Sequence, residues 1–181
     1  MYTYAVPQVD RVSFVSLVQT DVLHAEVVHT SQLRARVEQC LHSREPLAIV
    51  QAVSEYLPYL LGLYDCVLRD TILLRDDVHL TWRSMLVSSK FRLHGLLSEV
   101  CLMHMLYACS LRAEAATIVE ALGAYELGAH DRKACDDRLR VAIDLLCRAS
   151  DVCEYVATQL LPTYPAPPSK SAYPPELVSE G

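Results

Sequence analysis

Glycine and clustered positive charge are both scarce in this chain of 181 residues. Its 5 glycines never cluster, so the sequence has no glycine-rich loop of the kind that cradles phosphates. Lys and Arg form no run, and the formal net charge is −6, so neither nucleic acid nor an anionic membrane is expected as a default partner. What is abundant is Leu, Ala, Val and Arg, a composition that favours helix over sheet.

Closely paired cysteines are also missing. The 7 cysteines are an odd number, and no Cys-x-x-Cys spacing occurs, although structural zinc sites usually need such paired ligands. The N-terminus has neither a basic start nor an apolar run, so no secretory signal is expected. We therefore expect a cytoplasmic protein whose reduced thiols act as small core residues.

Long uncharged runs, which a membrane span requires, do not occur either. The two most apolar stretches are residues 46–64, which include Glu55, and residues 93–111, which include Glu99. Both are expected to be helices buried inside protein, and no integral membrane segment is predicted.

Apolar residues instead recur at helical spacing along most of the chain, which predicts a mostly α fold, an antiparallel helical bundle. Pro58 falls inside one of these patterns, so a kink or a break is expected there. Trp82 is expected to pack a helix entry into the core, with an interface anchor as the alternative. The predicted helices cover residues 32–42, 46–68, 91–122 and 138–161.

Three parts make up the expected organisation. Residues 1–30 form an N-terminal arm, in which the alternating, β-branched stretch 9–17 predicts a strand or extended segment. Residues 31–162 form the helical domain, preceded by an N-cap at Thr30. Residues 163–181 are rich in proline and are expected to be a linker or connection.

Candidate chemistry is sparse. Glu26 and His29 have the Glu-x-x-His spacing of ferritin-like metal sites, but such a site needs that motif twice and two further glutamates. A surface position is favoured for both residues, and a ferritin-like metal-binding bundle is kept as an alternative function. His104 lies among apolar residues and is expected to be a buried, hydrogen-bonded histidine instead of a base. We predict no catalytic residue, no cofactor and no metal ligand.

The remaining signal is the excess of apolar surface that these helices carry. Such a surface usually meets another helix or the rest of its own domain. The sequence therefore predicts a non-catalytic interaction module, and a structural helical subunit of a larger complex is a second reading of the same signal.

Three segments resemble one known family in their order and spacing. Residues 55–61 (EYLPYLL) are similar to its Tyr-Leu-Pro-Leu-Leu helix, and residues 80–84 to the Trp-x-Ser that follows. Residues 97–115 resemble its central helix, and residues 146–155 resemble a helix that ends in Leu-Pro, here residues 161–162. The family is the Bro domain, the ALIX-like adaptor domain of the endosomal sorting (ESCRT) machinery, and the likeness is greatest to its plant and algal branch.

This resemblance covers roughly residues 50–178. Ser98 stands where the family favours Phe, and Asp151 where it often has Gly. The chain is expected to stop about halfway through a typical Bro domain, before the family's main apolar contact residues.

The resemblance implies a curved, TPR-like helical scaffold with a small N-terminal sheet, working in the cytoplasm and peripherally on endosomes. It also implies a protein partner, the C-terminal helix of an ESCRT-III filament subunit. Asp136 and Arg140 match an acid and a base four residues apart in the family's binding patch, and at that spacing they share one helix face. A solvated cap region is the alternative reading of these two residues.

Overall fold

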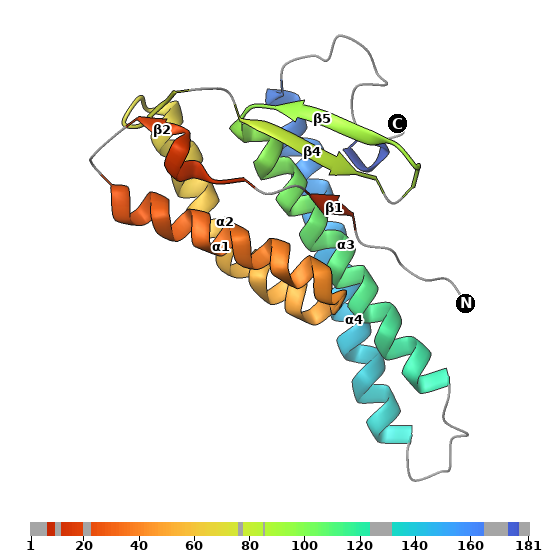
Figure 1. The fold of residues 1–181 in the computed structure, drawn as a ribbon. Coiled ribbons are helices and arrows are strands. Elements are labelled where there is room, and N and C mark those ends of the chain that lie inside the picture. Colours follow the sequence, from red (N-terminus) through yellow and green to blue (C-terminus); the bar gives the residue numbers. More distant parts are fainter. Residues whose placement is uncertain are drawn as a thin grey trace.

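Four long helices dominate the structure, a computed structural model that describes residues 7–9, 12–19, 23–75, 78–84, 86–123, 132–164 and 174–177. Figure 1 shows that they form two hairpins, and that the α3–α4 hairpin extends well beyond the α1–α2 hairpin. The expectation of a mostly α fold is confirmed. The helices are α1 (His24–Ser43), α2 (Pro46–Leu68), α3 (Leu96–Gly123) and α4 (Arg132–Tyr155).

Short strands form two small antiparallel sheets beside the helices. The larger sheet has the order β1-β4-β5 and lies over one end of α3 (Figure 1), and the smaller one pairs β2 with β3. The strands are β1 (Gln8–Val9), β2 (Val18–Gln19), β3 (Leu73–Leu74), β4 (His79–Arg83) and β5 (Lys90–His94). Shorter helical turns cover Phe14–Ser16, Val156–Leu160, Leu161–Thr163 and Pro175–Leu177.

The N-terminal extended segment is confirmed in part. The chain makes β1 and β2 as expected, but the helical turn Phe14–Ser16 interrupts what the alternation predicted as one strand. Phe14 is fully buried, and its backbone N–H donates to Ser31 Oγ on α1 at 3.0 Å. The buried aromatic ring therefore attaches the arm to the first helix, and the chain turns to place it.

The predicted start of the third helix at residue 91 is wrong. The chain is a strand from Lys90 to His94, and α3 begins at Leu96. Gly95 separates the two with a positive φ of 85°, a backbone conformation that glycine adopts without steric cost. Trp82 likewise lies in strand β4 and not at a helix entry, although its expected core position is confirmed because it is fully buried.

Segment 174–177 packs against this strand. The Trp82 indole N–H donates to one carboxylate oxygen of Glu176 at 3.4 Å, and the Ser84 hydroxyl donates to the other at 2.8 Å. Leu177 is only 4% exposed and joins the main core. The later part of the sequence therefore contributes a turn to the sheet region.

Two helices begin earlier than the sequence indicated. Thr30 was expected as an N-cap, but it lies inside α1, where its hydroxyl donates to the Glu26 carbonyl at 2.7 Å. Helix α1 thus begins within the region expected to be an arm. Helix α4 begins at Arg132 and not at residue 138 as predicted, because polar side chains on an exposed first turn hide the helical pattern.

Helix α2 continues through Pro58, so the break expected there is wrong. Proline leaves the carbonyl of Ser54 without its helical donor, but both residues are exposed and water can hydrogen-bond to that carbonyl.

By length and composition α2 could cross a membrane. It is a core helix here, since it packs between α1 and α3 with Ile49, Val53 and Leu60 buried.

A polar cluster joins three helices at the centre of the core. Arg34 of α1, Tyr56 of α2 and Glu99 of α3 are each at most 1% exposed. The Arg34 guanidinium forms an ion pair with Glu99 Oε1, and the Tyr56 hydroxyl donates to the same oxygen at 3.2 Å. Burial alone would lower the pKa of Arg34, but the adjacent Glu99 raises it, so Arg34 stays charged. Burial, reinforced by the Glu99 charge, raises the pKa of Tyr56 well above its usual value.

Replacing Glu99 with leucine should lower the free energy of unfolding by about 3–5 kcal/mol, because the Arg34 charge would stay buried without its partner. The double variant R34M/E99L removes both charges and should recover most of that loss. Urea denaturation followed by circular dichroism measures both. As a control, R36M breaks the Arg36–Glu55 pair, whose side chains are 53% and 47% exposed, and should cost less than about 1 kcal/mol. Equal losses in E99L and R34M/E99L would contradict this account.

Candidate partner-binding surface

One face of α4 packs closely on α3 through small side chains. Alanines predominate at the contact, so the two helix backbones can lie near each other along their length. This second core cluster is made of Val50, Ala108, Leu111, Ala115, Ala142, Leu145 and Ala149.

The outward side of α4 is apolar as well. Leu139, Ile143 and Leu146 are between 42% and 59% exposed. The first part of α4 belongs to the stretch of the α3–α4 hairpin that extends beyond α1 and α2 (Figure 1). Exposed apolar side chains gathered on one helix typically mark a surface for protein contact.

Asp136 and Arg140 lie on this outward side. With Leu139 and Ile143 they follow the i, i+3, i+4, i+7 pattern of a single helix face. Arg140 pairs with Asp137 at 3.4 Å, and these side chains are 78% and 58% exposed, so the pair contributes little stability. Arg140 could therefore exchange this carboxylate for a partner's at small cost.

A groove of about 430 Å³ adjoins the same face of α4, between α3 and α4. Leu146 lines the groove and is also 45% exposed, so groove and outward face are continuous. We call Asp136, Leu139, Arg140, Ile143 and Leu146 the α4 surface. The groove is lined by Leu86, Met105, Ala108, Cys109, Arg112, Leu146, Ala149, Ser150, Cys153 and Glu176.

Thiols make part of the groove wall. Burial raises the pKa of Cys109 to about 11, and partial desolvation at the groove wall also raises the pKa of Cys153 despite the opposing charge of Arg112. Both thiols therefore stay protonated at neutral pH and act as apolar lining, not as nucleophiles.

The expectation that cysteines are core residues is wrong for Cys147 and Cys153, which are exposed, whereas Cys109 is buried.

The other candidates from the sequence do not form a reactive site. His104 is a buried, hydrogen-bonded histidine as expected, because it is 8% exposed and its Nδ1 donates to the Val100 carbonyl at 2.7 Å. Glu26 and His29 are exposed, and the His29 ring packs edge-on against Tyr59. Across the described ranges, no three His, Cys, Asp or Glu side chains gather as a metal-binding group.

Sequence reasoning missed that α4 is apolar on two sides. Leu145 is 8% exposed, whereas the adjacent Leu146 is 45% exposed. The signal was present: Leu139, Ile143 and Leu146 form a second helical stripe beside the buried one. A stripe shows which residues share a face, but it does not show whether a neighbour covers that face.

Comparison with known proteins gives one informative match. The pH-response regulator protein palC of Cryptococcus neoformans var. neoformans serotype D (strain B-3501A) is 28% identical over 181 aligned residues, which cover 86% of this chain. The chain spans only 37% of that protein's length. No protein-family model matches the chain, and no solved structure matches it significantly.

His104 should make folding stability depend on pH. Burial lowers its pKa, so the unfolded chain binds this proton more readily than the folded one. The contribution of neutral His104 is therefore complete above the unfolded pKa of about 6.5 and is lost as pH falls toward the lowered folded value, at up to about 1.4 kcal/mol per pH unit. Between pH 7.5 and 5.5, H104Q should lose less free energy of unfolding than the natural protein does.

A matched variant, H24Q, removes an exposed histidine and should keep the natural pH dependence. Denaturant titrations at the two pH values measure all three proteins. An identical loss in H104Q and the natural protein would show that His104 is not the group responsible.

Proposed function

We propose that this chain is part of a Bro-type adaptor, which works without catalysis by binding a helical segment of a partner protein. Three observations support this: the order of the Bro-like segments, the similarity to a protein named as a regulator, and the uncovered α4 surface. The α4 surface carries most of the argument, because an apolar stripe with charges beside it is what an amphipathic helix recognises.

The shape of the α4 surface suits a helical partner. Leu139, Ile143 and Leu146 present anchors along about two helical turns, and the adjoining groove can receive side chains from the partner. Asp136 and Arg140 add opposite charges near the beginning of α4. Opposite charges near one end of an apolar stripe would favour one orientation of a bound helix over the other.

Within this proposal the partner is the C-terminal helix of an ESCRT-III filament subunit. The Bro resemblance supports that partner, together with a role in endosomal sorting and peripheral association with endosomes.

A structural role in a larger assembly is a second candidate, favoured by exposed Val141 on α4, which lies off the stripe. In that case the isolated chain would aggregate, and a partner subunit would restore its solubility.

Charge reversal at Asp136 or Arg140 should weaken binding of a labelled ESCRT-III C-terminal helix by about threefold to tenfold, since each reversal replaces an attraction by a repulsion. Fluorescence anisotropy on the protein in its full reading frame measures this, at two salt concentrations. The control D65R reverses an exposed charge on α2 and should leave affinity unchanged. Unchanged affinity in both D136R and R140E would remove these residues from the site.

Polar substitutions in the stripe test its apolar part separately. I143N and L139N should each reduce affinity about tenfold or more, because they place a polar group in the buried centre of the contact. Both side chains are exposed in the free protein, so the free energy of unfolding should change by no more than about 0.5 kcal/mol. Normal binding by the double variant would exclude the stripe as the docking surface.

A further inference from the structure

The larger sheet has one face packed on protein and one face turned outward. Side chains alternate along a strand, so Leu80 and Trp82 of β4 point into the core, where both are buried. In β5, Leu93 occupies the corresponding buried position. The outward face of the two strands consists of His79, Thr81, Arg83, Lys90, Arg92 and His94.

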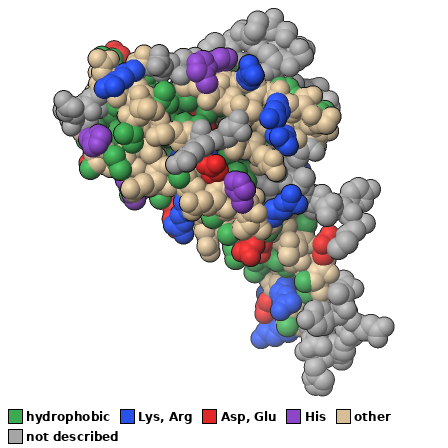
Figure 2. Space-filling model, viewed as in Figure 1, with side chains coloured by type: hydrophobic (Ala, Val, Ile, Leu, Met, Phe, Trp, Pro, Cys, Tyr) green, Lys and Arg blue, Asp and Glu red, His purple; other side chains and the backbone are tan. Residues whose placement is uncertain are grey.

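Every charged residue on this outward face is basic, in a chain whose net charge is −6. Figure 2 shows Lys, Arg and His side chains over the part of the surface that β4 and β5 occupy. His79 and His94 are cross-strand partners whose Nδ1 atoms are 2.8 Å apart. The strands thus gather positive charge that is dispersed along the sequence.

Three strands contribute to one row of this face. Gln8 of β1 pairs with Arg83 of β4, and Arg83 pairs with Lys90 of β5. Two like charges placed directly opposite each other across a sheet destabilise it. Among the residues that the structure describes, no carboxylate lies within ion-pair distance of Arg83, Lys90 or the nearby Arg44, although other arginines of the chain have such partners.

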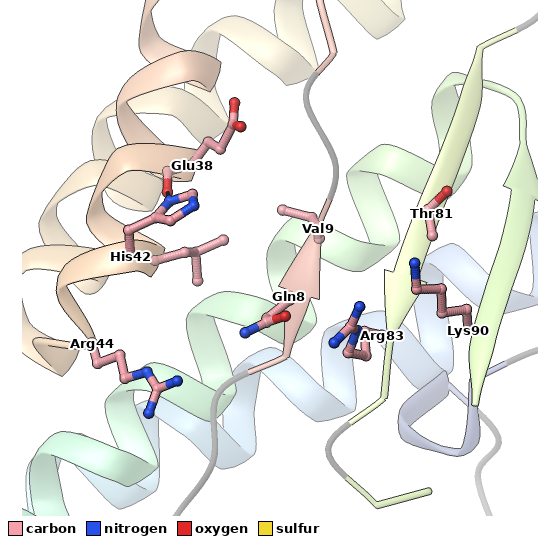
Figure 3. Close-up of a pocket in the computed structure, with 9 residues that line it drawn as sticks. Gln8, Val9, Glu38, His42, Arg44, Thr81, Arg83 and Lys90 are labelled. Carbon is pink, nitrogen blue, oxygen red and sulfur yellow. Dashed lines mark hydrogen bonds between the residues drawn. The ribbon is translucent and has the colours of Figure 1, made fainter. Parts of the chain in front are cut away.

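A cleft of about 380 Å³ lies between this row and the end of α1. Figure 3 shows Arg83 and Lys90 on the sheet side, Arg44 on the α1 side, and Gln8 between them. Arg44 follows the last residue of α1 in a left-handed conformation (φ 58°), which turns the chain at this wall of the cleft.

The lining is positive on balance. Besides three cations it contains one carboxylate, Glu38, and one histidine, His42, whose Nδ1 is bonded to the Glu38 carbonyl at 2.8 Å. Thr81 and Gln8 add a hydroxyl and an amide that can donate hydrogen bonds. A volume near 380 Å³ falls within the range of small-molecule pockets.

We propose that this cleft binds a small ligand bearing several phosphate groups, such as an inositol polyphosphate. Arginine forks match phosphate oxygens in pairs, and lysine adds a compact charge, so Arg44, Arg83 and Lys90 suit more than one phosphate. A bound polyanion would also relieve the repulsion between Arg83 and Lys90. The same chemistry is available from a free polyphosphate and from a lipid headgroup. The site is separate from the α4 surface and does not depend on its proposed function.

Isothermal titration with inositol hexakisphosphate tests the proposal. The double variant R83Q/K90Q should lose about tenfold or more in affinity, because charge-assisted contacts are removed. The matched control K133Q/R138Q removes the same amount of charge from exposed positions of α4 and should bind normally. Equal affinity in the two variants, or no binding by the natural protein, would overturn the proposal.

Two further measurements complete the test. Sedimentation with phosphatidylcholine vesicles, with and without phosphatidylinositol 4,5-bisphosphate, shows whether the ligand is a lipid headgroup or a free polyphosphate. Capture of the protein only by vesicles that contain the bisphosphate assigns a headgroup. If neither kind of vesicle captures the protein but inositol hexakisphosphate still binds in the titration, the ligand is a free polyphosphate. Thermal denaturation without ligand checks folding. The melting temperature of R83Q/K90Q should equal or exceed the natural value, since the variant removes a cross-strand repulsion, and a lower value would contradict that part of the argument.

Discussion

The carboxylate of Glu99 is the point on which the arrangement of the helices depends. It accepts from the Arg34 guanidinium and the Tyr56 hydroxyl, so a single buried acid on α3 connects α1 and α2 to the second hairpin. An ion pair of this kind contributes little net stability, because desolvating both charges is costly. Its value is specificity: sliding one helix past another would leave a buried charge without its partner.

This constraint has consequences for both candidate surfaces. With α1 and α2 held at one end of α3, the other end of the α3–α4 hairpin extends away from them (Figure 1). Leu139 and Ile143 lie on α4 and are left uncovered. At the opposite end, the same packing brings the end of α1 to the edge of the sheet, where Arg44 faces the row of Arg83 and Lys90. The proposed partner surface and the proposed anion cleft are thus spatially separate.

Charge in this protein shows why overall composition is a poor guide to local binding. A net charge of −6 argued against anionic partners, and that argument holds for the chain as a whole. Strand pairing nevertheless concentrates Arg83, Lys90 and Arg92 on one face of a small sheet. No run of Lys and Arg appears in the sequence, because apolar residues that face the core alternate with the basic ones.

The sequence by itself determined the class of the fold and much of the core. Helical periodicity identified the four long helices, since that period is a local property of the chain. The Bro resemblance, and not the periodicity, pointed to Asp136 and Arg140, and their role in binding stays a prediction.

Tertiary structure alone decided which faces were covered and which distant residues met. The ion pair of Arg34 with Glu99 and the row of Gln8, Arg83 and Lys90 join residues far apart in sequence, so no local pattern contains them. The β4–β5 hairpin was missed for a related reason: its apolar residues also fit a helical stripe when read without their cross-strand partners. Pairing between β4 and β5 is what distinguishes a hairpin from a helix here. Gly95 then ends β5 before α3 begins.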